Sequence, residues 1–211
     1  MSAPTLDPTD VKQMLLKVAD VIIESEEMLS QADRDLGDGD HGLGMQRGFT
    51  AAKAQLEGLD PKTVAEVFTT TGMALMASMG GASGAVMGML FQSGGAALGA
   101  NDSLDADGLC AFLQGACDGV TNLGGAKPGD KTMVDALAGA RDKAEDIDCE
   151  TVSEALQAAC DGATEGMEAT KAMIATMGRA KTLGEKSIGH PDPGALSVSI
   201  IFKTMSDYAN Q

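Results

Sequence analysis

The sequence predicts an all-α fold, and three observations support this. Only 3% of the 211 residues are aromatic, with five Phe, one Tyr and no Trp, whereas sheet proteins usually fill their cores with aromatic and β-branched side chains. Fourteen Met, many Ala and abundant Leu are typical of packed helices. Apolar residues recur at helical spacing, and no alternating β-branched run is long enough to specify a strand.

Start and stop signals divide the first half of the chain into four helices. Asp7 followed by Pro8 begins the first helix, because proline fits the first helical turn. The second helix follows the turn-rich stretch DRDLGDGDHG and ends at Gly58, and the third opens at Pro61. The glycines of GGASG separate the third from the fourth. The predicted ranges are about 8–31, 42–57, 61–79 and 84–98.

The second half of the chain gives four more helices. Asp102 to Asp105 begin the fifth, the loop NLGGAKPGD precedes the sixth, and Glu150 and Thr151 begin the seventh. The long stretch GRAKTLGEKSIGHPDPG precedes the eighth, whose segment LSVSIIF also alternates partly, as a strand does. The predicted ranges are about 105–122, 131–144, 151–176 and 194–209.

Residues 1–211 are predicted to form a single domain, an eight-helix antiparallel up-and-down barrel or bundle. Short connections make consecutive helices antiparallel, so alternate connections lie at the same end. The first, third, fifth and seventh connections contain GDGDHG, GGASG, GGAKPGDK and GHPDPG, while the others read as ordinary solvated turns. We therefore expect all four unusual loops to meet at one rim.

Charge and cysteine content exclude several classes of protein. The net charge of −16 argues against nucleic-acid binding, because it repels phosphate backbones. The four cysteines form no CxxC pair, which predicts reduced thiols and a cytoplasmic location. Val67 to Asn101 carries no charged residue, but its Gly, Ser and Thr content indicates buried helices and no membrane span. Residues 1–20 contain no long apolar run, so no signal peptide is predicted.

Four aspartates lie close together in the first unusual loop: Asp33, Asp35, Asp38 and Asp40. A solvated acidic turn is the plain alternative, but the interspersed glycines let the backbone fold back and bring the carboxylates together. Like charges at that density repel unless a cation lies among them. Oxygen ligands suit Mg²⁺, and the spacing fits neither an EF-hand nor a di-iron bundle. Two Mg²⁺ ions would offset most of the negative charge of three carboxylates and the phosphates of ADP or ATP, so a two-metal nucleotide site is predicted.

The other rim loops suit the same ligand. GGASG supplies backbone N–H groups and Ser83 at a helix N-terminus, and GDKT supplies Lys131, although no Walker A loop is present. Arg179 and Lys181 are cations in an acidic chain and are candidate phosphate contacts. Neither histidine has an obvious Ser or Cys partner, so nucleophilic catalysis by this chain is not expected.

Together, the motifs GDGDHGLGMQRG, GGASG, KPGDKTM and LGEKSIGHPDPGA resemble the nucleotide-binding L subunit family of dihydroxyacetone kinases. The likeness runs from about Asp33 to Asp192 by motifs and spans nearly the whole chain by length. It implies an eight-helix antiparallel barrel with the nucleotide at one end, in agreement with the rim expected from alternation. It also implies a phosphotransferase subunit that acts on a sugar hydroxyl.

The resemblance implies site residues motif by motif. It makes Asp33, Asp38 and Asp40 the ligands of Mg²⁺, with Asp35 outside that trio. It makes Arg179 the residue that approaches the phosphates, and so the catalytic candidate. The other implied nucleotide contacts are His41, Gly42, Leu43, Gly44, Ala82, Ser83, Gly124, Met133, Asp192, Pro193 and Gly194.

The resemblance also implies partners. The family transfers phosphate to a short keto sugar that a separate K subunit holds covalently on a histidine, so this chain is expected to act only with that subunit. One branch uses free ATP; in the other, ADP stays bound and a phosphotransferase-system M subunit rephosphorylates it from phosphoenolpyruvate. A free-standing L chain, and His41 where the ATP branch tends to have Cys, favour the second branch. Gly44 stands where the family has Asn, which weakens that preference and predicts a backbone or water contact there.

Other interpretations stay open. One is an ATP-dependent kinase subunit for a different small keto sugar or sugar acid. Another is a non-catalytic metal- and nucleotide-binding module that regulates a partner. The sequence is also compatible with a homodimer.

Overall fold

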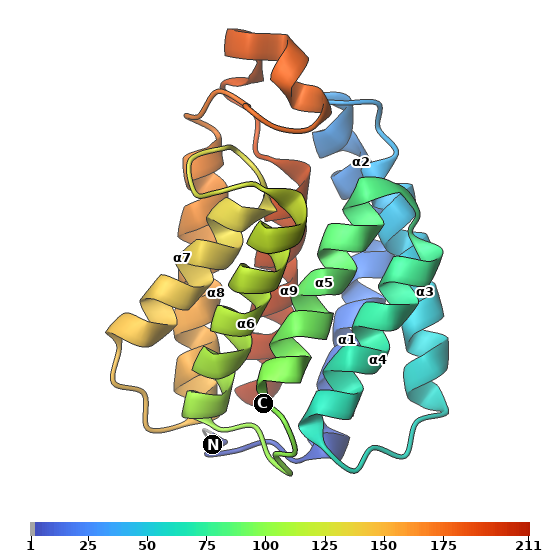
Figure 1. The fold of residues 1–211 in the computed structure, drawn as a ribbon, viewed down its shortest axis with the longest axis vertical. Coiled ribbons are helices and arrows are strands. Elements are labelled where there is room, and N and C mark those ends of the chain that lie inside the picture. Colours follow the sequence, from blue (N-terminus) through green and yellow to red (C-terminus); the bar gives the residue numbers. More distant parts are fainter. Residues whose placement is uncertain (1–2) are drawn as a thin grey trace.

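The computed structural model describes residues 3–211, and the regular structure in this part of the chain is helical (Figure 1). The all-α prediction is confirmed, because residues 3–211 contain no strand beyond an isolated bridge between Leu6 and Leu104. Within these residues, the helices are α1 (Pro8–Glu24), α2 (Glu26–Arg34), α3 (His41–Glu57), α4 (Val64–Ser78), α5 (Gly81–Ala97), α6 (Ala106–Gly124), α7 (Met133–Asp146), α8 (Val152–Thr170), the 3₁₀-helix η1 (Arg179–Ser187) and α9 (Pro193–Ala209).

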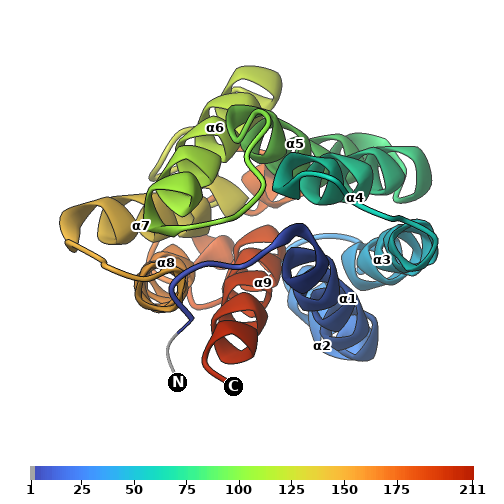
Figure 2. The same cartoon turned by 90° about the horizontal axis from the view of Figure 1, so that it is seen from below.

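The long helices form a closed ring, which Figure 2 shows end-on. From α3 to α9, each α-helix packs against the next along the chain, and α9 closes the ring on α1. All five phenylalanines of the chain are at most 1% exposed. Phe49 of α3 meets Phe91 of α5 edge-on, and Phe68 of α4 meets Phe112 of α6, so aromatic contacts join helices that are not adjacent in sequence.

The predicted count of eight helices is wrong, because the segment predicted as one helix over residues 8–31 forms two. At the break, the Ser25 hydroxyl donates to the Val21 carbonyl at 2.7 Å, and Ser25 has a ψ of 4°. A serine that bonds back to the preceding turn often bends a helix. The second piece, α2, then leads directly into the aspartate loop.

Three further differences concern the rim loops. The seventh predicted helix ends at Thr170 and not at residue 176; there the Thr170 carbonyl accepts a hydrogen bond from the Lys131 ammonium. Part of the loop predicted before the eighth helix forms η1, the orange segment at the top of Figure 1. The fourth predicted helix begins at Gly81 and not at residue 84, because a φ of 78° at Gly80 makes the turn earlier.

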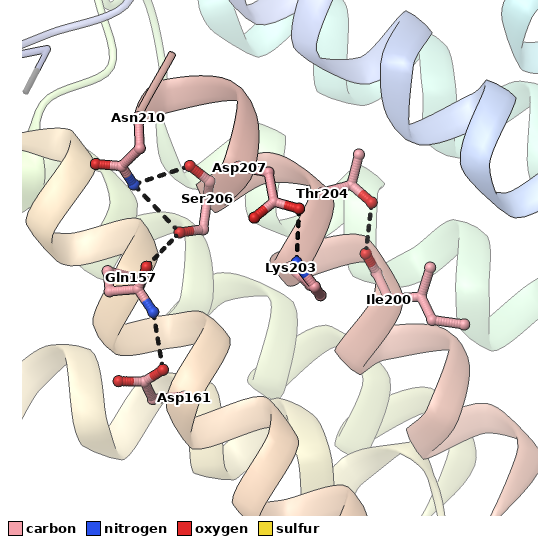
Figure 3. A network of polar contacts seen from close by, with 8 residues as sticks. All are labelled: Gln157, Asp161, Ile200, Lys203, Thr204, Ser206, Asp207 and Asn210. Atoms are coloured by element: carbon pink, nitrogen blue, oxygen red, sulfur yellow. Dashed lines mark hydrogen bonds and ion pairs between the residues drawn. The ribbon is translucent and has the colours of Figure 1, made fainter. Parts of the chain in front are cut away.

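The segment LSVSIIF is helical, as predicted. Val198, Ile201 and Phe202 are buried at spacings of three and four residues, which places them on one face of α9. Polar side chains tie α9 to α8, where Ser206 Oγ donates to Gln157 Oε1 at 3.0 Å (Figure 3). Burial of one face therefore outweighs the partial strand-like alternation of this segment.

The connections divide between two ends of the ring, as alternation predicts. The connections after α2, α4, α6 and α8 lie at the upper end in Figure 1, and the start of α1 and the end of α9 lie at the lower end. Antiparallel neighbours alternate in direction, so the N-terminal ends of α3, α5, α7 and α9 all face the upper end. None of the helices formed by residues 3–211 has the length and apolar character needed to cross a bilayer.

Candidate functional site

A cavity of about 660 Å³ opens at the upper end, where the four glycine-rich connections meet. Its volume lies within the usual range for small-molecule sites. All the predicted site residues except Gly42 line it: Asp33, Asp38, Asp40, His41, Leu43, Gly44, Ala82, Ser83, Gly124, Met133, Arg179, Asp192, Pro193 and Gly194. Residues as far apart in sequence as Asp33 and Gly194 therefore line the same cavity.

Gly42 has a packing role instead of a place in the cavity wall. An added Cβ at this position would lie 2.2 Å from the Glu26 carbonyl oxygen and 2.4 Å from Ser30 Oγ. Glycine therefore allows the first turn of α3 to approach α2, and this approach fixes the two ends of the aspartate loop. Gly44 differs, because its Cβ position faces the cavity and has only the Met79 carbonyl oxygen nearby, at 4.0 Å.

Three of the four loop aspartates converge. Asp33, Asp38 and Asp40 each offer a carboxylate oxygen, and these atoms all lie within 4.8 Å of one another. Gly39 makes the convergence possible, because its φ of 78° lets the chain turn back toward Asp33. The His41 N–H donates to the Asp33 carboxylate at 3.2 Å, so Asp33 also holds the first turn of α3 in place.

Arg179 of η1 lies against this cluster. Its guanidinium contacts Asp38, and its Nη2 atom lies 3.7 Å from Asp40 Oδ2. One guanidinium against three carboxylates leaves a local charge of about −2, which suits a divalent cation with a preference for oxygen ligands. Asp35 stands outside the cluster and lies 3.4 Å from His190 Nδ1.

Four helix N-termini surround the cavity and supply partial positive charge beside the carboxylates. Within the described part of the chain, no side chain caps the N-terminus of α5. Its first N–H groups, at Gly81, Ala82 and Ser83, have no carbonyl partner within the helix. Such an end binds anions, so the cavity combines a candidate cation cluster with a candidate phosphate seat.

His41 is held as a neutral ring. Its Nε2 atom lies 2.8 Å from Ser197 Oγ, and the Ser197 hydroxyl donates to the Pro193 carbonyl at 3.0 Å. Since that hydroxyl proton is already used, His41 is the donor to Ser197. Burial lowers the pKa of His41 below its ordinary value of 6.5, and the charge of Asp33 offsets this only in part. Its place at the site is therefore that of a fixed wall residue.

Asp192 and Lys131 line the cavity beside the N-terminal ends of α9 and α7, respectively. Asp192 caps α9 by accepting from the Ala195 N–H at 2.8 Å, and loss of hydration raises the pKa of the Asp192 carboxyl to about 7. Lys131 of the GDKT motif lines the cavity, and its buried ammonium donates to two backbone carbonyls. Lys181 is not among the residues that line the cavity.

Sequence reasoning missed most of the apolar wall of the cavity. This wall contains Met79, Val86, Met87, Val120 and Met177, together with the predicted Met133. Several of these residues lie one helical turn from GGASG or from Gly124, so helical periodicity applied to those motifs is the signal that finds them. Arg47 was also missed; it lines the cavity and donates to the carbonyls of Ser78 and Met79 at the end of α4.

Known proteins resemble this chain in sequence. Residues 35–207 match the model of the DAK2 domain family. The chain is 36% identical over 204 residues to the ADP-binding subunit DhaL of the PEP-dependent dihydroxyacetone kinase of Escherichia coli K12, a match that covers 96% of this chain and 97% of that protein. It is 38% identical over 197 residues to a D-erythrulose kinase of Mycolicibacterium smegmatis, covering 90% of this chain and 33% of that protein.

A solved structure is also similar. The crystal structure of the dihydroxyacetone kinase from C. freundii in complex with AMP-PNP and Mg²⁺ matches this chain with a TM-score of 0.69 and 29% identity. The match covers 93% of this chain and 33% of that longer chain.

Proposed function

This chain belongs to the DAK2 domain family, and we propose that it is the nucleotide-binding subunit of a dihydroxyacetone-type kinase. In this role it holds ADP or ATP with Mg²⁺, and the terminal phosphoryl group passes to a short keto sugar on a separate K subunit. One observation carries the proposal: three converging carboxylates share a cavity with an uncapped helix N-terminus. Carboxylates alone repel a nucleotide, so this combination fits a phosphate group bound through metal.

The donor set of the cluster fits magnesium. Asp33, Asp38 and Asp40 would hold it, since their oxygens converge and the guanidinium of Arg179 balances only part of their charge. We propose two ions, because two Mg²⁺ together with the Arg179 guanidinium would offset most of the negative charge of three carboxylates and the nucleotide phosphates. Bound Mg²⁺ neutralises charge on the phosphates during transfer. The kinase from C. freundii was crystallised with AMP-PNP and Mg²⁺, which supports this assignment.

The chain's own residues divide between the two parts of the nucleotide. The apolar wall with Met133 and Gly124 receives the base and sugar. The N–H groups of Ala82 and Ser83 receive phosphate oxygens, and Arg179 stabilises charge on the transferring group. The remaining implied contacts enclose the nucleotide: His41, Gly42, Leu43, Gly44, Asp192, Pro193 and Gly194. Of these, Gly42 acts through the packing of α3 on α2.

The keto-sugar site and the general base are proposed to lie on the K subunit. His41 lines the cavity, but its Nε2 atom is engaged with Ser197 and burial lowers its pKa, so it is a weak base for a sugar hydroxyl proton. A K subunit docked on the upper end would bring its sugar to the nucleotide. It would also exclude water, which otherwise competes as phosphoryl acceptor.

The phosphoryl source is proposed to be phosphoenolpyruvate, relayed by a phosphotransferase-system M subunit to bound ADP. Similarity over nearly the full length of a PEP-dependent subunit from Escherichia coli supports this branch. A second candidate is a kinase subunit for another keto sugar, which the 38% identity to a D-erythrulose kinase favours.

Product formation tests the proposal. The chain is incubated with a K subunit encoded beside it, dihydroxyacetone, and either ATP or phosphoenolpyruvate with the M subunit and its phosphate carriers. We expect sugar phosphate only when the K subunit is present. D-Erythrulose is tested in parallel as the alternative phosphoryl acceptor. Turnover by the isolated chain would refute the division into two subunits. Inactivity with every such K subunit would favour a regulatory nucleotide-binding module.

A further inference from the structure

Lys131 is a buried lysine in an unusual backbone conformation. It is 1% exposed, and its φ of 59° is the only positive value at a non-glycine position among residues 3–211. Lysines are almost never fully buried unless their charge is paired, and left-handed geometry costs a residue with a side chain free energy. Two unfavourable features at one position require a compensating set of contacts.

The compensation comes from two backbone carbonyls. The Lys131 ammonium donates to Thr170 O at 2.5 Å and to His190 O at 2.6 Å. Thr170 is the last residue of α8, where carbonyl groups lack helical partners and carry partial negative charge. His190 lies just before Asp192, the residue that caps α9. One ammonium therefore holds together the two ends of the segment 171–190.

Neighbouring contacts fasten the same segment to the same loop. Thr176 Oγ1 donates to Asp130 Oδ1 at 2.7 Å, beside Lys131 in sequence. The Gly189 N–H donates to Lys171 O at 2.7 Å, which closes the base of the segment. Between these points lie Met177 to Ala180, which line the cavity and include Arg179.

We propose that Lys131 is a positioning residue that anchors the segment 171–190, so that Arg179 faces the aspartate cluster and the nucleotide phosphates. Its action is indirect, since its ammonium donates to the backbone carbonyls of Thr170 and His190. The inference rests on the proposed function where it concerns nucleotide binding; the anchoring itself depends only on the contacts above. A lysine that merely capped α8 would affect stability without affecting Arg179.

The matched control is Lys12. At the opposite end of the ring, its Nζ donates to Leu59 O at 2.8 Å and to Glu57 O at 3.3 Å, so it is another lysine that satisfies two carbonyls at the C-terminal end of a helix. Lys131→Met and Lys12→Met each remove one ammonium and keep an unbranched apolar chain. Thr176→Val serves as a milder variant of the anchor, because Thr176 is exposed and its loss leaves no buried carbonyl unpaired.

Hydrogen exchange of the nucleotide-free protein is the first measurement. We expect exchange of amides in 171–190 to rise about tenfold or more in Lys131→Met, less in Thr176→Val, and not at all in Lys12→Met. Unchanged exchange in a folded Lys131→Met protein would overturn the anchoring. If Lys131→Met does not fold, Thr176→Val decides alone.

Calorimetric titration with ADP and Mg²⁺ is the second measurement. A segment that is correctly placed a tenth of the time weakens binding about tenfold, and we expect that loss in Lys131→Met. Arg179→Ala should weaken binding in the wild-type background but add little in Lys131→Met, because the two act as a unit. If the losses of affinity from Arg179→Ala and Lys131→Met add fully, Lys131 only caps the C-terminal end of α8 and does not position Arg179. Failure of the wild-type protein to bind ADP would refute the proposed function, while the exchange result still decides the anchoring.

Discussion

The Arg179 guanidinium contacts Asp38, and its Nη2 atom lies 3.7 Å from Asp40 Oδ2. The residue proposed to reach the phosphates therefore lies in contact with two of the residues proposed to hold metal. The guanidinium partly balances the acidic cluster in the metal-free chain, and a bound cation must share the same carboxylates with it. Under the proposed function, binding of metal and nucleotide is therefore linked energetically to the position of the segment that carries Arg179.

Replacing Asp38 by alanine should weaken binding of ADP in the presence of Mg²⁺ by several kcal/mol, on the order of lost metal–phosphate bridging. The matched control is Asp35→Ala, because Asp35 lies outside the cluster and faces His190. Its effect should be milder. Calorimetry on both variants checks the assignment. Equal losses of affinity would mean that Asp33, Asp38 and Asp40 are not the set that holds the metal.

ADP with Mg²⁺ should raise the melting temperature of the protein. A ligand that binds only the folded state stabilises it by about 2.7 kcal/mol at a hundredfold excess over Kd. EDTA should abolish the shift, since carboxylates and phosphates repel one another without a cation. Equal stabilisation by ADP in EDTA would indicate that Arg179 and backbone amides hold the phosphates without metal.

The stability of the metal-free protein should fall as pH rises, in part because of Asp192. Its pKa is raised to about 7 in the folded chain, against an ordinary value of 3.8. Between these values the folded state binds a proton that the unfolded state has lost, so the free energy of unfolding decreases with rising pH. The variant Asp192→Asn keeps an acceptor for the Ala195 N–H. Relative to this variant, the free energy of unfolding of the wild type should fall by roughly 2–3 kcal/mol between pH 5 and pH 8.

Denaturant unfolding in EDTA at several pH values measures this difference. Parallel pH profiles for the wild type and Asp192→Asn would show that Asp192 titrates normally.

The two glycines at the start of α3 should respond oppositely to alanine. Gly42→Ala should destabilise the protein by about 1–3 kcal/mol, because its Cβ would lie 2.2 Å from the Glu26 carbonyl oxygen. Gly44→Ala meets nothing closer than 4.0 Å and should stabilise the helix by up to about 1 kcal/mol. Urea unfolding of both variants checks the contrast. Similar destabilisation by both would contradict the proposed packing of α3 on α2.

Local sequence signals located most of the helices, since caps act within a few residues. Asp7, Thr63 and Thr151 each accept a backbone N–H at the first turn of a helix, close to where start signals placed those helices. The break at Ser25 was not predicted, because a serine in an apolar-periodic segment is compatible with a continuous helix. The break depends on the hydrogen bond from the Ser25 hydroxyl to the Val21 carbonyl.

The sequence by itself determined most of the helices, the alternation that carries four glycine-rich loops to one rim, and the group of aspartates in the first loop. These follow from contacts between near neighbours and from the direction of consecutive helices. Only the tertiary structure decided that Arg179 contacts Asp38, that Gly42 packs on Glu26, and that Lys131 bonds to Thr170. Each of these joins residues whose separation is fixed by the packing of whole helices, and no local pattern specifies such distances.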